Sequence, residues 1–284
     1  MSLGFGGQVL HLCSGDARVR FRVPESYAPF VVDGGRDGCV VRCDVGPLEP
    51  SPGPAVHSEP RAWELRRPPE GGEETFFCSG APPGTPLWLL RFAPSFREAR
   101  LTFRESETPG VIHVGRAATV LEYMTARLVA RAGGLHLHAS FAIAEGKAYV
   151  FVGHSGAGKS TIAEIAERCG ARIPTDDRTI LTFDGGVRAW GTPWNGSFAR
   201  KTPESAPVRA VYLLQQAGAD AVVPIPAARV VPELFTRLIH PRVSAEEVEL
   251  SLEALERLAA ALPVATLRFR RASSAFECAR AWAP

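Results

Sequence analysis

The feature that most constrains this chain is a glycine-rich segment, Gly-His-Ser-Gly-Ala-Gly-Lys-Ser, at residues 153–160. The apolar residues 148–152 before it predict a buried strand, and residues 160–169 after it predict a helix that ends before Gly170. A strand, a glycine-rich turn and a helix in this order are typical of an α/β domain. We therefore expect a phosphate-binding loop where the strand passes into the helix.

The spacing of this segment suits a nucleoside triphosphate. Its glycines allow successive backbone N–H groups to point at phosphates, and the helix N-terminus adds partial positive charge. The lysine supplies charge to the β- and γ-phosphates, and the serine hydroxyl after it is suited to Mg²⁺. Lysine is scarce in this chain, which makes a chance match rare. ATP and Mg²⁺ are therefore the expected cofactors, and the expected binding residues are Gly153, His154, Ser155, Gly156, Ala157, Gly158, Lys159, Ser160 and Thr161.

Two adjacent carboxylates, Asp176 and Asp177, follow a short predicted strand downstream of the loop. One could orient Mg²⁺ or its waters while the other accepts the proton of an attacking hydroxyl. Such a pair is also common in turns, but its place after a glycine-rich loop favours the chemical interpretation. His138 lies on the strand expected beside the loop strand. The basic candidates for stabilising a transferring group, among which the sequence does not choose, are Arg172, Arg178, Arg200, Lys201 and Arg209.

The pattern of apolar residues changes along the chain and predicts a mostly-β domain at residues 1–108 and an α/β domain at residues 109–284. Proline-rich stretches at residues 46–60 and 68–86 predict irregular loops in the first domain. An exposed sheet edge there could dock a peptide or partner protein. The strands predicted in this domain are residues 19–23, 30–32, 39–45, 75–78, 87–92 and 99–103.

The second domain alternates helical and extended patterns. Ser244 and Glu247 form a capping-box pattern at the start of one of its helices. The predicted helices are residues 117–131, 160–169, 244–262 and 273–282, and the predicted strands are residues 135–143, 148–152, 171–173, 179–183, 187–190, 208–214 and 264–269.

Composition excludes several classes of partner. A formal net charge of +2 without a basic run argues against nucleic acid. No apolar run approaches a membrane span and the N-terminus lacks a signal-peptide pattern, so we expect a cytoplasmic protein with no membrane partner. The cysteines lack the spacing of a zinc site and are expected to be buried free thiols: Cys13, Cys39, Cys43, Cys78, Cys169 and Cys278.

Three segments together resemble the catalytic core of HPr serine kinase/phosphorylases: residues 137–140, 153–161 and 175–178. The resemblance is stronger still to the shorter HPr-kinase-like proteins of peptide-modifying gene clusters, including lasso-peptide kinases. It covers about residues 133–200. It implies a P-loop kinase domain of the HPr kinase and phosphoenolpyruvate carboxykinase type, and serine phosphorylation of a peptide or small protein by ATP.

The resemblance also implies roles for single residues. Lys159 and its loop would hold ATP, Ser160 would bind Mg²⁺, and Asp177 would be the general base. Asp176 and His138 would support the metal and the phosphates, with Asp176 as a metal ligand. The stretch with a metal-binding glutamate that follows the Asp pair in the bifunctional enzymes is absent here, so neither HPr as acceptor nor phosphorylase activity is expected.

Three hypotheses of function remain open at this point. The leading one is a Mg²⁺-ATP-dependent kinase acting on a Ser or Thr hydroxyl of a peptide or small protein. The alternative is a catalytically reduced, kinase-like scaffold that binds a precursor peptide or partner protein without phosphorylating it. The third is a nucleotide-switched regulator that hydrolyses ATP slowly. The sequence leaves open whether the chain forms a homo-oligomer.

Overall fold

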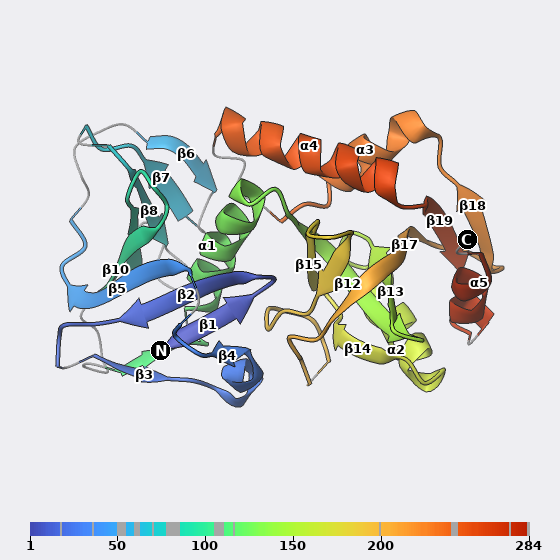
Figure 1. The fold of residues 1–284 in the computed structure, drawn as a ribbon, viewed down its shortest axis with the longest axis horizontal. Helices are drawn as coiled ribbons and strands as arrows, with labels where there is room; N and C mark the ends of the chain where they lie inside the picture. Colours follow the sequence, from blue (N-terminus) through green and yellow to red (C-terminus); the bar gives the residue numbers. More distant parts are fainter. Residues whose placement is uncertain are drawn as a thin grey trace. The chain divides into compact units, whose positions relative to one another are not determined.

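A computed structural model of the chain describes residues 1–17, 19–35, 37–49, 55–59, 63–69, 71–77, 86–104, 111–115, 117–198, 200–239, 244–272 and 274–282. The chain divides into two compact units, one of residues 1–4 and 8–124 and the other of residues 5–7 and 125–284. The division falls within helix α1 (Ala118–Arg131), whereas the sequence placed the domain boundary at residue 108. Figure 1 shows the elements of both units in sequence colours.

The first unit is built mainly of β-strands. Its large sheet has the strand order β4-β1-β2-β5-β10-β9-β8-β7-β6, in which β5 pairs in parallel with both β2 and β10. A separate parallel pair joins β3 and β11. The strands are β1 (Ser2–Phe5), β2 (Gln8–Cys13), β3 (Arg20–Arg22), β4 (Val31–Val32), β5 (Cys39–Gly46), β6 (Ala55–Glu59), β7 (Trp63–Arg66), β8 (Glu73–Phe77), β9 (Trp88–Phe92), β10 (Glu98–Arg104) and β11 (Val111–His113), with a 3₁₀ helix at Glu25–Phe30.

The mostly-β character expected of the N-terminal region is therefore found, but the expected loop at residues 46–60 is partly wrong. β6 lies inside that stretch because residues 55–59 pair antiparallel with β7. The neighbouring strand β7 supplies backbone hydrogen bonds to β6, and the proline-rich composition of this stretch does not reveal that pairing. Cys78 lies outside the described residues. Cys39 and Cys43 are buried as expected, whereas Cys13 is exposed and Cys169 and Cys278 are half-buried, which corrects the expectation for these three.

The second unit contains a sheet in which the order of strand pairing closes into a ring. β12 pairs with β13 and β15, β15 pairs with β16, β16 pairs with β17, and β17 pairs back with β13. Within it, β13, β17 and β19 run parallel. The strands are β12 (Leu135–Ala144), β13 (Lys147–Val152), β14 (Arg172–Thr175), β15 (Arg178–Thr182), β16 (Arg188–Trp190), β17 (Ser205–Gln216), β18 (Ala221–Pro224) and β19 (Val264–Phe269).

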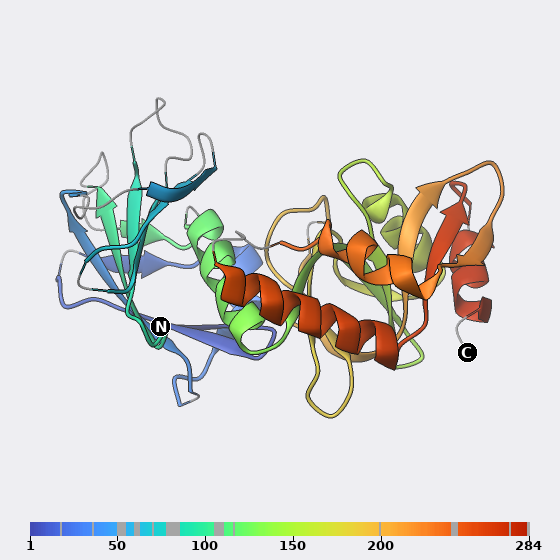
Figure 2. The same cartoon turned by 90° about the horizontal axis from the view of Figure 1, so that it is seen from above.

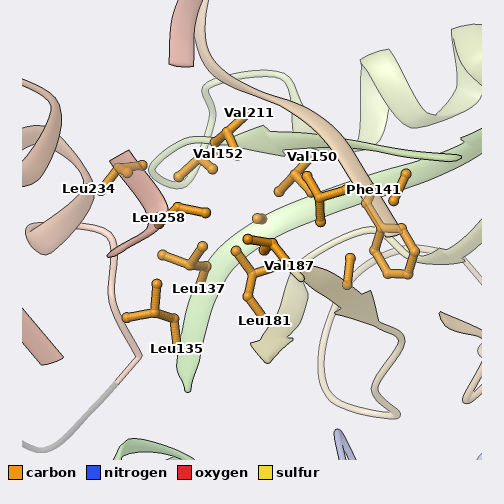
Figure 3. Packing of buried hydrophobic residues seen from close by; sticks show 14 of the residues in the cluster. Leu135, Leu137, Phe141, Val150, Val152, Leu181, Val187, Val211, Leu234 and Leu258 are labelled. Carbon is orange, nitrogen blue, oxygen red and sulfur yellow. The ribbon is translucent and has the colours of Figure 1, made fainter. Parts of the chain in front are cut away.

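Helices cover both faces of these parallel strands. On one face, α2 (Lys159–Arg168) and α5 (Ser274–Trp282) pack on Phe151 and Tyr212. On the other, α3 (Ala227–Phe235) and α4 (Ala245–Ala261) pack on the inward side chains of β12 and β13. Figure 3 shows this second cluster, with Leu234 and Leu258 facing Leu137. In Figure 2, α3 and α4 lie side by side. The second unit is thus a mixed α/β structure with strands between helices.

The predicted elements of this unit are confirmed within a few residues, including the strand, loop and helix around residues 148–169. The sequence did not predict α3 or β18. Helix α3 begins after Pro226 and contains Pro232, so its sequence lacks an uninterrupted helical pattern. None of the helices in the described part of the chain combines the length and apolar character that a membrane crossing requires.

The capping box predicted at the start of α4 is only half formed. The Ser244 hydroxyl accepts the expected hydrogen bond from the Glu247 backbone N–H at 3.1 Å. The Glu247 carboxylate does not complete a capping box, because the Arg127 guanidinium binds it at 2.7 Å and Arg131 at 3.2 Å. Arg127 and Glu247 are both almost fully buried, at 0% and 3% side-chain exposure. A buried ion pair therefore links α1 to α4.

We predict that Glu247→Ala lowers the free energy of unfolding by about 3–5 kcal/mol, because it removes this carboxylate from a buried guanidinium. Urea unfolding followed by circular dichroism measures the loss. The neighbouring Glu246→Ala is the matched control, since Glu246 is 64% exposed and its pair with Arg131 should contribute less than about 1 kcal/mol. Equal losses in the two variants would contradict a special role for the buried pair.

Candidate functional site

The glycine-rich loop of residues 153–158 leads from the carboxyl end of β13 into α2. Gly158 has a φ of +102°, and a Cβ there would lie 2.6 Å from the Phe269 ring. The Gln216 side-chain amide donates to the Gly156 carbonyl oxygen at 2.9 Å. Gln216 and Phe269 end β17 and β19, so the loop lies at the carboxyl ends of the three parallel strands, where ligands of open α/β sheets commonly bind.

Lys159 is folded against its own loop. Its side chain is only 6% exposed, and its amino group donates to the carbonyl oxygens of Gly153 and His154, each at 3.1 Å. The same amino group lies 3.3 Å from Asp177 Oδ1. Burial lowers the pKa of Lys159, and the Asp177 carboxylate partly offsets that effect. The lysine is thus a buried positive charge at the start of α2.

Asp177, between β14 and β15, is the centre of a second set of contacts. His138 Nε2 lies 2.8 Å from Asp177 Oδ1, and the Arg178 guanidinium donates to Oδ2. Burial alone would raise the pKa of Asp177, but the hydrogen bond to His138 and the charges of Arg178 and Lys159 lower it to about 2. At 18% exposure the carboxylate is accessible and remains ionised at neutral pH.

Asp176 is fully buried and has different partners. Its Oδ1 accepts from the Lys201 amino group at 3.0 Å. Its Oδ2 accepts from the Ser160 hydroxyl at 3.1 Å, from the Ser197 backbone N–H at 2.7 Å and from the Ser197 hydroxyl at 3.0 Å. Burial raises the pKa of Asp176, but the bonds from Ser197 and Lys201 outweigh it, so the pKa is lowered. Four donors occupy a carboxylate that has about four acceptor positions.

The segment of residues 191–201 supplies most of these donors, and of its residues the sequence had singled out only Arg200 and Lys201 as candidates for the site. A Cβ on Gly196, whose φ is +77°, would lie 1.9 Å from Asp176 Oδ1. Only a glycine allows this approach. Asn195, also at positive φ, offers its carbonyl oxygen to the Lys201 amino group. The sequence signal was present in the turn residues around Asn195-Gly196, but a turn pattern does not reveal which side chain it covers.

The remaining predicted site residues are placed as follows. His154, Ser155 and Gly156 are exposed on the loop, and Thr161 lies in the first turn of α2. Arg178 contacts Asp177 and Lys201 contacts Asp176, so both belong to the site. Arg172 instead pairs with Glu204 at 2.8 Å, and Arg200 and Arg209 are exposed. Arg209 follows Val208, which pairs with Ala148 at the end of β13 remote from the loop.

This arrangement combines a helix start, which is in general suited to anions, with a buried lysine and an ionised, accessible carboxylate. The Ser160 hydroxyl, at the start of α2, is an oxygen donor that could serve a hard cation, whereas the Asp176 carboxylate that accepts its hydrogen bond is already occupied by donors. In the described part of the chain, no three His, Cys, Asp or Glu side chains group closely enough to hold a metal ion by themselves. A cation here would therefore need further ligands from a bound phosphate or from water.

One comparison with known proteins matches the middle part of the chain. A family model described as SynChlorMet cassette protein ScmC matches residues 113–237, which is less than half of the chain. The matched region contains the glycine-rich loop, the Asp pair, His138 and the segment of residues 191–201. A search of curated proteins finds no significant match. The chain is thus similar to the ScmC family over the residues that form the site.

We predict that Lys201→Met lowers the free energy of unfolding at pH 7 by about 3 kcal/mol or more, because it leaves the buried Asp176 carboxylate without its cation. The paired carboxylate has a lowered pKa, so its contribution is present above the pKa of the unfolded chain and is lost as pH falls. The difference from wild type should therefore shrink as the pH is lowered towards and below 3.8, the ordinary pKa of an aspartate.

Urea unfolding at several pH values tests this prediction. Lys147→Met is the matched control, because Lys147 is exposed at the start of β13 and should change stability by less than about 0.5 kcal/mol. A Lys201→Met protein as stable as the control at pH 7 would show that the pair with Asp176 does not hold the segment of residues 191–201.

Proposed function

We propose that this chain is a Mg²⁺-ATP-dependent kinase, related to HPr-kinase-like proteins, that phosphorylates a Ser or Thr hydroxyl of a peptide or small protein. The observation that carries the proposal is the meeting of Lys159, His138 and Arg178 at the Asp177 carboxylate, beside a glycine-rich loop at a helix start. A P-loop kinase fold of the HPr kinase and phosphoenolpyruvate carboxykinase type is part of the same proposal. The peptide acceptor rests on the family resemblance.

The loop suits the triphosphate of ATP on physical grounds. The first backbone N–H groups of α2 and the preceding glycines can bind phosphate oxygens, and the helix start favours negative charge. The Lys159 amino group would exchange the carbonyl oxygens of Gly153 and His154 for phosphate oxygens, which are stronger acceptors. Its loss from Asp177 would remove one of the charges that lower the pKa of that carboxylate.

Mg²⁺ fits the same place, with Ser160 as the residue that would hold it. Mg²⁺ retains several waters and is usually bound through few protein oxygens together with substrate phosphates. Asp176 accepts a hydrogen bond from the Ser160 hydroxyl and is otherwise engaged by Lys201 and Ser197. We therefore assign Asp176 the orientation of Ser160. The ion, when bound, would neutralise charge that develops on the phosphates.

In this proposal Asp177 accepts the proton of the acceptor hydroxyl. In the proposed reaction a bond forms between the hydroxyl oxygen and the γ-phosphorus, the bond from the γ-phosphorus to the bridging oxygen breaks, and ADP leaves. His138 and Arg178 keep the carboxylate in one orientation through both of its oxygens. Arg178 also provides positive charge beside the transferring group.

A second candidate function is the binding scaffold, and one observation favours it. The four donors to Asp176 leave that carboxylate saturated, so it offers no position for direct coordination of a metal. A kinase-like protein that lost the metal site could retain the loop and bind a peptide. The two functions differ in whether Asp177 carries out proton transfer or only balances the charges around it.

We predict that Asp177→Asn reduces phosphoryl transfer by about 10²–10⁴-fold, because the amide cannot accept the hydroxyl proton. The measurement is the initial rate of ³²P incorporation from γ-³²P-ATP into a mixture of synthetic serine peptides. Asp184→Asn is the matched control, since Asp184 is exposed in the turn between β15 and β16 and should retain the wild-type rate.

The same variants separate the alternatives when binding of the peptides is measured beside ³²P incorporation. Incorporation that Asp177→Asn leaves intact would contradict the role of Asp177 as the base. Peptide binding by wild type and both variants, with no incorporation in any of them, would favour the scaffold instead of the kinase.

A further inference from the structure

A polar groove of about 380 Å³ is lined in part by Leu214, whose Cβ would lie 3.6 Å from a Cβ on Gly153 at the start of the glycine-rich loop. It is lined by the ends of β17, β18 and β19 and by one side of α3. Three arginines line it: Arg229 lies in α3, Arg237 lies just after α3, and Arg268 lies in β19. One carboxylate, that of Glu233 in α3, lines it as well. No step of the proposed phosphoryl transfer uses these four residues.

The charges in this groove do not balance. Arg229 and Arg237 share the Glu233 carboxylate, at 2.6 Å and 3.0 Å respectively. The hydrogen bond from Arg229, together with the charge of Arg237, keeps the pKa of Glu233 below its usual value, so this carboxylate is ionised. Arg268 donates to the neutral Gln215 amide oxygen at 3.3 Å. Among these lining residues, positive charge therefore exceeds negative charge.

The groove reaches the proposed base through a short chain of contacts. The Arg237 carbonyl oxygen accepts a hydrogen bond from the His138 backbone N–H at 2.8 Å, and the His138 ring contacts Asp177. The charge of Arg237 also contributes, after burial, to lowering the pKa of His154 in the first half of the loop. Arg237, which lines the groove, thus contacts the strand that carries His138, the partner of Asp177.

We propose that this groove binds an acidic segment of the phosphoryl acceptor, next to the hydroxyl that is phosphorylated. The inference rests on the proposed kinase function and adds a substrate class, a serine or threonine peptide with Asp or Glu residues near the acceptor. Guanidinium groups bind carboxylates through paired hydrogen bonds, which gives both affinity and orientation. A purine base is uncharged and would leave the excess of positive charge unanswered.

Two fluorescently labelled peptides test this inference, one with a central serine flanked by glutamates and one with glutamines in their place. Fluorescence anisotropy with wild-type protein should show about tenfold tighter binding of the glutamate peptide, as expected for charged hydrogen bonds. Arg229→Glu should abolish that preference and leave the affinity for Mg²⁺-ATP within twofold of wild type. Arg229 is 68% exposed, so the change should be compatible with folding.

Arg172→Glu is the matched control, because Arg172 is also exposed, at 65%, and also forms an ion pair with a glutamate. Its backbone pairs with that of Ile143, at the end of β12 remote from the loop. It should retain the preference for the glutamate peptide. Equal binding of the two peptides by wild type, or a loss of ATP affinity in Arg229→Glu, would overturn the proposal. Selective binding of the glutamate peptide without ³²P transfer to it would support the groove and contradict the kinase function.

Discussion

The site depends on one buried charge pair, between Lys201 and Asp176. The carboxylate is fully buried and the lysine is 7% exposed, so neither charge would be stable there without the other. The pair joins the segment of residues 191–201 to the end of β14, and the Ser160 hydroxyl connects the same carboxylate to α2. The start of α2, and with it the glycine-rich loop, is therefore held by an interaction outside the loop itself.

The two adjacent aspartates divide their roles because their side chains enter different surroundings. Asp176 is surrounded by donors that saturate it, whereas Asp177 contacts His138, Lys159 and Arg178 and remains partly exposed. A saturated, buried carboxylate is suited to holding structure, and an accessible, ionised one is suited to accepting a proton. Under the proposed function, nucleotide binding would draw Lys159 from Asp177, which would raise the pKa of that base towards a more useful range.

The local elements were predictable because their signals are local. The strand, loop and helix around Lys159 have clear apolar periods and glycines, and the sequence placed them within a residue or two. The contribution of Ser197 and Gly196 was not predictable, since it arises from a turn that contacts Asp176 across 20 residues of intervening chain. Helix α3, with its proline, and the groove beside it likewise depend on tertiary packing that no periodic pattern records.

The most direct test of the account is a titration of Mg²⁺-ATP into wild type and Lys159→Ala, followed by calorimetry and by thermal unfolding. A ligand that binds only the native state raises its stability, by about 2.7 kcal/mol at a concentration of 100 times Kd. The account predicts binding and stabilisation of wild type, both lost in Lys159→Ala. No binding by either protein would contradict a nucleotide site at the glycine-rich loop and would favour the scaffold.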